Sequence, residues 1–233
     1  MYETIFIIHR LILLLGAIIP VIIIFAINKK NSYIGKKELM LSNFVILTMF
    51  VVFAKCFQFI LDKVYEDISV IQLFNIKYII SFIASGYTFF GGYVGSLLAI
   101  FLMNKKFKTN PKMSFWFVNN LNIMYAIMKL GCLLGGCCCG FTVIPIQLLE
   151  SVISLVIYVF MIIIYINNKQ PNKSIGLSII LFSTERFIIS FYRAYMTNLA
   201  FWGTEIISIV LIFIGSIIYL KNKKEEKRWV RNF

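Results

Sequence analysis

Long apolar segments, separated by short polar connections, follow one another along the whole chain. Several of them approach or exceed the roughly 20 residues that a helix needs to cross about 30 Å of hydrocarbon. No segment shows the alternating ten-residue pattern of a membrane β-barrel strand. The pattern therefore predicts an all-α integral membrane protein, one domain over residues 1–233, with about seven transmembrane helices. We expect the spans at about 5–27, 40–61, 84–104, 113–139, 145–166, 175–193 and 203–220.

Composition supports this class, because hydrophobic residues make up 60% of the chain and charged residues only 14%. The formal net charge of +13 is compatible with a nucleic-acid partner, but the basic residues lie in every second connection rather than on one soluble face. By the positive-inside rule, this alternation places the N-terminus outside and the C-terminus inside. We therefore predict a multi-pass membrane protein with no nucleic-acid partner, in which residues 62–83 form an outer loop and an interfacial segment. The lysine-rich connections are 28–37, 105–112, 169–173 and 221 onward.

Three ionisable residues lie inside predicted spans at similar depth. At about 1.5 Å of rise per residue, Lys129, Glu150 and Arg186 all fall in the outer half of the bilayer. Charges at that depth are costly and usually serve a function. A single polar cavity shared by the three helices explains these residues better than three unrelated buried charges.

Polar residues recur at helical spacing around these charges, so that four predicted helices turn a polar face toward something other than lipid. The fourth span contributes Tyr125 and Cys132, the fifth Gln147, Ser151 and Ser154, the sixth Ser190 and Arg193, and the seventh Thr204, Glu205 and Ser208. One interpretation is that these faces only hold the helices together through ion pairs and hydrogen bonds.

A cationic pocket open to the outer leaflet is the interpretation we favour. The predicted spans carry more cations than a neutral packing network needs, namely Lys129, Arg186 and Arg193. Uncharged polar groups would hold helices together at a lower desolvation cost. Such a pocket suits an anionic lipid headgroup, above all a phosphate, which arginine holds through two parallel hydrogen bonds.

Small residues and cysteines each allow two interpretations. Small residues in the third span recur at the four-residue spacing of close helix packing, although bare backbone would also admit a lipid; they are Gly86, Gly91, Gly92, Gly95, Ser96 and Ala99. Cys132 and the cysteine run 137–139 together supply four thiols, the number that a tetrahedral zinc site needs. Three consecutive cysteines cannot all face one ion from a helix, so we predict no metal and interpret the cysteines mainly as small packing residues. An outer-face disulfide or an acyl-thioester intermediate is the lesser alternative.

Four motifs, in order and at compatible spacing, resemble those of the bacterial prolipoprotein diacylglyceryl transferases. Phe89-Phe90-Gly91-Gly92 is similar to F-H-G-G in that family, and Lys129-Leu130-Gly131-Cys132 is similar to G-R-x-G-N/C. Residues 145–150 (PIQLLE) resemble H-P-x-Q-L-Y-E, and residues 186–193 (RFIISFYR) resemble R-F-x-x-E-F-x-R. The resemblance covers about residues 86–215 and implies a seven-span protein of the bacterial plasma membrane with its N-terminus outside.

The activity that the resemblance implies is transfer of the diacylglyceryl group of phosphatidylglycerol to the thiol of a lipobox cysteine in a prolipoprotein signal peptide, with release of glycerol phosphate and no cofactor. The cations would hold the phosphate and stabilise the charge on the leaving group. The candidate catalytic residues are Lys129, Glu150, Arg186, Glu185 and His9. The candidate substrate-binding residues are Gly91, Gly92, Tyr125, Cys132, Gln147, Ser190, Arg193 and Glu205.

At four positions the chain departs from the family pattern. Phe90 stands where a histidine is expected, Lys129 where an arginine is, Cys132 where asparagine is common, and Ser190 where a glutamate is. The phosphate-binding charge is therefore kept, whereas the expected base for the acceptor thiol is not. Glu185 and His9, the single histidine, are the candidates to replace it. A second hypothesis is a non-catalytic relative that binds or transports an anionic lipid or lipopeptide.

Overall fold

The computed structural model describes residues 2–66, 88–107, 110–136, 140, 144–194 and 198–230. Within these ranges the regular structure is helical apart from one antiparallel bridge between Gly140 and Arg193. The predicted all-α fold class is confirmed for this part of the chain. The helices are α1 (Tyr2–Asn31), α2 (Lys36–Glu66), α4 (Phe89–Phe107), α5 (Pro111–Leu134), α6 (Ile146–Asn168), α7 (Pro171–Ser190) and α8 (Asn198–Val230).

Five of the described helices are long and apolar enough to cross a membrane. They contain the candidate spans Ile7–Asn31, Lys36–Ile60, Pro111–Leu134, Ile146–Asn168 and Phe201–Lys221. The other two fall short over their described length, because α7 carries Glu185 and Arg186 and α4 has only 19 residues and ends in lysines. A multi-pass membrane protein follows, while the count of seven spans and the orientation of the termini stay predictions.

Several predicted boundaries differ from the structure. The predicted fourth span, for example, ends at Leu134 rather than at residue 139, because the chain turns at Gly135 and Gly136. The predicted outer loop at 62–83 begins inside α2, which continues to Glu66, and its residues 67–83 lie outside the described part of the chain. The predicted sixth span ends at Ser190, three residues early, because the chain then turns and Arg193 pairs with Gly140. Arg193 therefore lies on a turn beyond α7.

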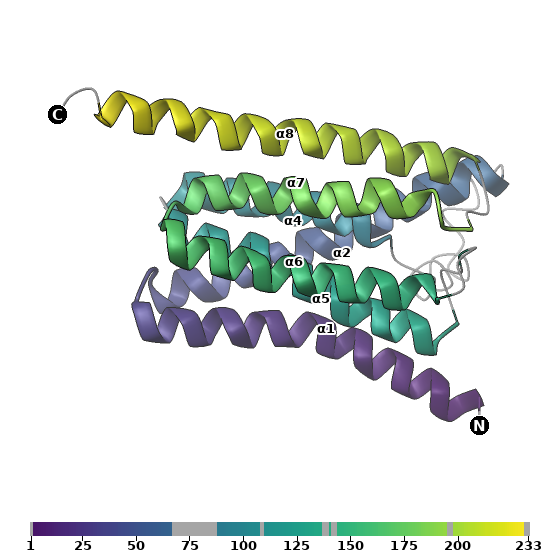
Figure 1. The fold of residues 1–233 in the computed structure, drawn as a ribbon. Helices are drawn as coiled ribbons and strands as arrows, with labels where there is room; N and C mark the ends of the chain where they lie inside the picture. The colour runs from purple at the N-terminus through teal and green to yellow at the C-terminus, as the bar shows by residue number, and fades with distance from the viewer. Residues whose placement is uncertain are drawn as a thin grey trace.

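The helices lie side by side along one common direction, with α8 and α1 on opposite sides of the bundle (Figure 1). α5 contacts α1, α4, α6 and α7, whereas α2 packs on α4 and α8 packs on α7. α5 is therefore the most buried of the five candidate spans. Any side chain on its inner face meets residues from several helices at once.

Apolar residues cover the outside of this bundle and polar residues occupy part of its interior. Phe44 on α2 and Phe213 on α8 are 68% and 67% exposed, as suits contact with hydrocarbon rather than water. Asn119, Asn122 and Glu150 are completely buried. The predicted inward polar face is thus seen in the described helices.

An aromatic core forms between α4, α5 and α7. The rings of Tyr93 and Phe182 stack with centroids 4.1 Å apart, and Phe89 and Tyr125 pack beside them at 4.6 Å from each other. All four rings belong to the main hydrophobic core. This packing fixes the direction of Tyr125, which begins the polar cluster described below.

Basic residues gather at one end of the bundle. The last turns of α1 and α4 and the first turns of α5 and α7 lie there, together with the C-cap of α6 (Figure 1). We call it the lysine-rich end; its lysines include Lys29, Lys30, Lys105, Lys106, Lys112, Lys169 and Lys173.

Candidate functional site

Glu150 is the centre of a buried ion cluster near the other end of the bundle. Its side chain, on α6, is 0% exposed. Lys129 Nζ on α5 lies 2.7 Å from Glu150 Oε2, and Tyr125 on the same helix donates a 2.8 Å hydrogen bond to Oε1. Arg186 on α7 donates to the same oxygen. Residues predicted on three separate spans are thus brought together on one carboxylate.

Arg193 approaches the cluster from the turn after α7. Its guanidinium Nη1 lies 3.8 Å from Glu150 Oε1, beyond hydrogen-bonding distance, and its side chain is 12% exposed. The bridge to Gly140 holds its backbone, and a Cβ on Gly140 would lie 2.7 Å from the carbonyl oxygen of Tyr192. Only glycine allows this close approach, so Gly140 positions Arg193.

Three cations converge on Glu150. Lys129, Arg186 and Arg193 each place a charged nitrogen 3.8 Å or less from its carboxylate. Aromatic faces offset part of the cost of burying these charges, because the Arg186 guanidinium lies 5.7 Å from the Phe90 ring centroid and Lys129 Nζ lies 5.1 Å from that of Tyr125. Cations gathered in this way beside one carboxylate suit a bound anion.

Two further buried carboxylates lie near the cluster, each paired with a serine of a neighbouring helix. The hydroxyl of Ser154 on α6 lies 2.8 and 2.6 Å from the two carboxylate oxygens of Glu185 on α7. Ser190 donates its hydroxyl to Glu205 Oε1 on α8. Glu205 Oε2 is also buried and has no hydrogen-bond partner within the described ranges. It is an acceptor that a substrate is able to use.

Deeper in the bundle, neutral polar residues form hydrogen bonds with one another. Asn122 Nδ2 donates to Ser178 at 3.0 Å and to Asn119 Oδ1 at 3.2 Å, and Asn119 donates to the carbonyl oxygen of Tyr158. These neutral hydrogen bonds join α5 to α6 and α7. The interpretation of the polar faces as helix-joining contacts fits these asparagines and serines, whereas the three cations belong to the ion cluster.

His9 lies on another side of α5. Its Nδ1 donates to the carbonyl oxygen of Gly131 at 2.7 Å, and a Cβ on Gly135 would touch the same ring. Because successive helical residues are about 100° apart, Gly131 lies about 200° around α5 from Lys129. The structure therefore does not bring His9 into contact with the ion cluster.

The remaining candidate residues lie in different settings. A Cβ on Gly91 would lie 2.7 Å from the carbonyl oxygen of Phe53, and one on Gly92 would lie 2.5 Å from the Phe50 ring, so both glycines pack against α2. Gln147 is buried one turn before Glu150, and Cys132 is a half-buried cysteine outside any disulfide, one turn after Lys129. The cysteine run 137–139 lies outside the described residues. In the described part, no three His, Cys, Asp or Glu residues come together as metal ligands would.

Two residues of the site were not among the candidate site residues predicted from sequence. Ser154 was recognised only as part of the polar face of the fifth span. It follows Glu150 by one helical turn, and this spacing could have indicated that it lies in the site, beside Glu185. Gly140 offered a weaker signal, because its role depends on a backbone contact with a turn about 50 residues away.

Comparison with known proteins agrees with the motif pattern. Residues 7–221 match the profile of a family described as prolipoprotein diacylglyceryl transferase. The chain is also 24% identical over 167 residues to the protein named phosphatidylglycerol–prolipoprotein diacylglyceryl transferase 2 of Clostridium perfringens (strain 13 / Type A). That alignment covers 62% of this chain and 65% of the relative, a little under two thirds of the relative's length.

Proposed function

Because this chain belongs to the prolipoprotein diacylglyceryl transferase family, we propose that it transfers the diacylglyceryl group of phosphatidylglycerol to the thiol of a lipobox cysteine in a prolipoprotein signal peptide. The setting we propose is the bacterial plasma membrane. The single observation that carries the proposal is the convergence of Lys129, Arg186 and Arg193 on Glu150. The phosphodiester group of the lipid headgroup is an anion of the kind that such cations bind.

Arg193 is the residue that we propose meets the phosphate first. It is the most exposed of the three cations and lies farthest from Glu150. Arginine grips phosphate through two parallel hydrogen bonds, so a phosphate bound to Arg193 lies next to Arg186 and Lys129 as well. Glu150 and Tyr125 hold those two side chains in place before the lipid arrives.

The proposed chemistry is a displacement at the glycerol carbon that bears the phosphate. The acceptor thiol loses its proton, the thiolate forms a new S–C bond, and the C–O bond to phosphate breaks. The phosphate thereby changes from a diester monoanion to a monoester dianion and leaves as glycerol phosphate. Preorganised cations stabilise the charge that develops on the leaving oxygen, which is where Lys129, Arg186 and Arg193 act in this proposal.

Glu205 is the carboxylate that we assign as acceptor of the thiol proton. Glu150 already holds three cations, and the two oxygens of Glu185 are both contacted by Ser154. Glu205, in contrast, has one buried oxygen with no hydrogen-bond partner among the described residues. A thiol must be deprotonated to become a nucleophile, so an available acceptor close to the cations serves the reaction.

A second candidate function is binding of an anionic lipid or lipopeptide without chemistry. The observation that favours it is Phe90, which is buried beside Arg186 at the position where the family pattern has a histidine. With an aromatic ring at this place and His9 across α5, no imidazole of the described chain contacts the ion cluster. The cluster would then hold a phosphate and leave it intact.

A transfer assay separates the two functions. The purified protein is placed in phosphatidylglycerol vesicles with a synthetic lipobox peptide, and mass spectrometry reads the mass of one diacylglyceryl group added to the peptide. We expect this product with the native chain and with Lys106→Gln, an exposed lysine at the lysine-rich end, and its loss with Arg186→Gln. Binding of phosphatidylglycerol without product would reject the transferase and support the second function.

A further inference from the structure

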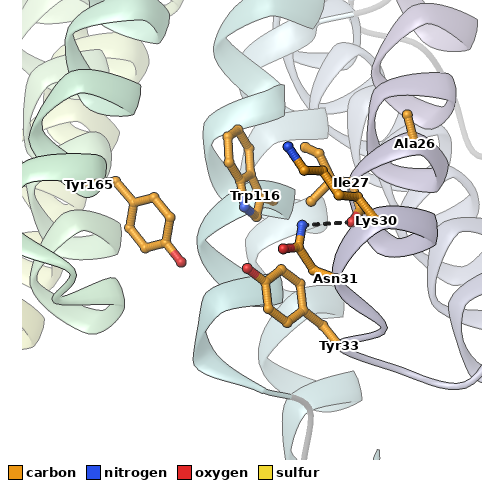
Figure 2. A pocket seen from close by; sticks show the side chains of 7 residues that line it. All are labelled: Ala26, Ile27, Lys30, Asn31, Tyr33, Trp116 and Tyr165. Atoms are coloured by element: carbon orange, nitrogen blue, oxygen red, sulfur yellow. Dashed lines mark hydrogen bonds between the residues drawn. The ribbon is translucent and has the colours of Figure 1, made fainter.

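A cavity of about 420 Å³ opens at the lysine-rich end, far from the ion cluster. Its walls come from the last turns of α1, from Trp116 on α5 and from Tyr165 on α6 (Figure 2). Trp116 precedes Lys129 by 13 residues on the same helix, which corresponds to about 20 Å along its axis. This cavity is therefore separate from the proposed substrate site.

The lining combines an apolar wall with hydrogen-bond donors. Ala26 and Ile27 form the apolar wall on α1. Lys30 contributes an ammonium group, and Figure 2 shows its side chain extending toward Trp116. The hydroxyls of Tyr33 and Tyr165 lie close to each other at the opposite edge. Among the described residues that line the cavity, Lys30 is the one charged side chain, so the charge of this lining is positive and complements an anion.

The position of the cavity indicates where the occupant comes from. α1 packs mainly on α5, and residues of α1, α5 and α6 line the cavity, so it opens between α1 and α6. Tryptophan and tyrosine rings next to lysines are typical of the level where acyl chains meet headgroups. Basic pockets between membrane helices at such an end suit anionic phospholipid headgroups. The neighbouring lysines Lys29, Lys112 and Lys169 strengthen this attraction.

We propose that this cavity binds one anionic phospholipid from the leaflet at the lysine-rich end. The phosphate accepts hydrogen bonds from Lys30 and from one hydroxyl of the Tyr33–Tyr165 pair, and one acyl chain lies along Ile27 and Trp116. A lipid bound in this way joins α1 to α6, which share few direct contacts. Its role is to hold α1 on the bundle, and it is not the lipid that the transferase consumes.

Tryptophan fluorescence tests the proposal directly. The chain has three tryptophans, so Trp202→Phe and Trp229→Phe leave Trp116 as the only tryptophan emitter. The protein is placed in phosphatidylcholine nanodiscs that contain a few per cent of phosphatidylglycerol or phosphatidylcholine with brominated acyl chains, which quench fluorescence on contact. We expect brominated phosphatidylglycerol to quench Trp116 at least fivefold more efficiently than brominated phosphatidylcholine.

Matched lysine variants show whether Lys30 makes the selection. Lys30→Gln is expected to reduce the preference for the anionic lipid to less than twofold, whereas Lys106→Gln, which removes an exposed lysine of α4 at the same end, should leave it unchanged. Equal quenching by the two lipids in the native chain would overturn the proposal, as would an unchanged preference in Lys30→Gln. Loss of the preference on adding millimolar inorganic phosphate would also overturn it, because the ligand would then be a free anion. The proposal is independent of transferase activity, since fluorescence is read without an acceptor peptide.

Discussion

Ser190 on α7 donates its hydroxyl to the carboxylate of Glu205 on α8. The family pattern has a glutamate at the position of Ser190, so Glu205 brings a carboxylate to that place from the next helix. Both residues are buried, at 1% and 4% exposure, so there is room for one carboxylate but not for two. This pair makes it possible to test whether transfer requires only a carboxylate at this place, or requires that the carboxylate be attached to α8 rather than to α7.

Exchanging the two residues should preserve function better than changing either one. We expect Glu205→Ser alone to lower the rate of transfer to a lipobox peptide by about 100-fold, as loss of a proton acceptor commonly does. Ser190→Glu alone should be inactive, because it places two carboxylates side by side in a buried site. The double variant Ser190→Glu with Glu205→Ser should recover to within about tenfold of the native rate. A double variant no better than the worse single variant would show that the carboxylate cannot be moved.

Glu150 should be the residue on which stability depends most strongly. Removing one partner of a buried ion pair costs about 3–5 kcal/mol, because the other charge stays buried and unpaired. Glu150→Gln should therefore lower the thermal unfolding midpoint in detergent, whereas Glu38→Gln, at an exposed carboxylate on α2, should change it little. Adding Lys129→Met to Glu150→Gln should raise the midpoint again, since one uncompensated cation is removed. Additive losses in the double variant would contradict the central role of Glu150.

The sequence predicted the meeting of Lys129, Glu150 and Arg186 because each lies on a separate span at a similar depth. Depth and helical period are local properties, so they can be counted along the chain. The direction in which His9 faces could not be derived in this way. It depends on how α1 packs against Gly131 and Gly135, which is a relation between two helices.

Gly91 and Gly92 show a second limit. Small residues at this spacing equally suit a neighbouring helix or a lipid, and only the position of α2 decides between them. Likewise, a serine at position 190 reads as the loss of a carboxylate until α8 is placed and Glu205 is seen beside it. The hydrophobic and polar pattern of the sequence could not predict contacts between helices that are far apart along the chain.

Lys129 should tolerate arginine but not an uncharged side chain. In Lys129→Met the cation opposite Glu150 Oε2 is lost, and with it one charge that stabilises the leaving phosphate. We expect kcat to fall by about 100-fold, as for removal of one preorganised donor. Lys129→Arg keeps the charge and adds a fork suited to phosphate, so its kcat should stay within about tenfold of the native value. Equal losses in the two variants, measured as peptide lipidation, would show that shape rather than charge is required at this position.

Gly140 should be sensitive to a single methyl group. In Gly140→Ala the new Cβ meets the Tyr192 carbonyl oxygen at 2.7 Å and Ile146 Cβ at 2.8 Å, so the turn that carries Arg193 must shift. Overpacking of this kind costs about 1–3 kcal/mol. We expect a higher KM for phosphatidylglycerol, because Arg193 is proposed to meet its phosphate first. Gly203→Ala on α8 is the matched control, since a Cβ there meets nothing within 4 Å. An unchanged KM in Gly140→Ala would separate Arg193 from substrate binding.

Phe90→His should supply a base where the native chain has an aromatic ring. The Phe90 ring lies 5.7 Å from the Arg186 guanidinium, so an imidazole at this position would lie beside the proposed phosphate site. In a Glu205→Gln background, which lacks the proposed proton acceptor, we expect Phe90→His to raise the transfer rate at least tenfold. The rescued rate should increase with pH between about 5 and 8, because only the neutral imidazole accepts a proton. Phe90→Leu in the same background removes the ring without adding a base and should give no rescue. If the histidine and leucine variants transfer equally slowly at every pH, position 90 does not face the acceptor thiol, and the proton must leave by way of another residue.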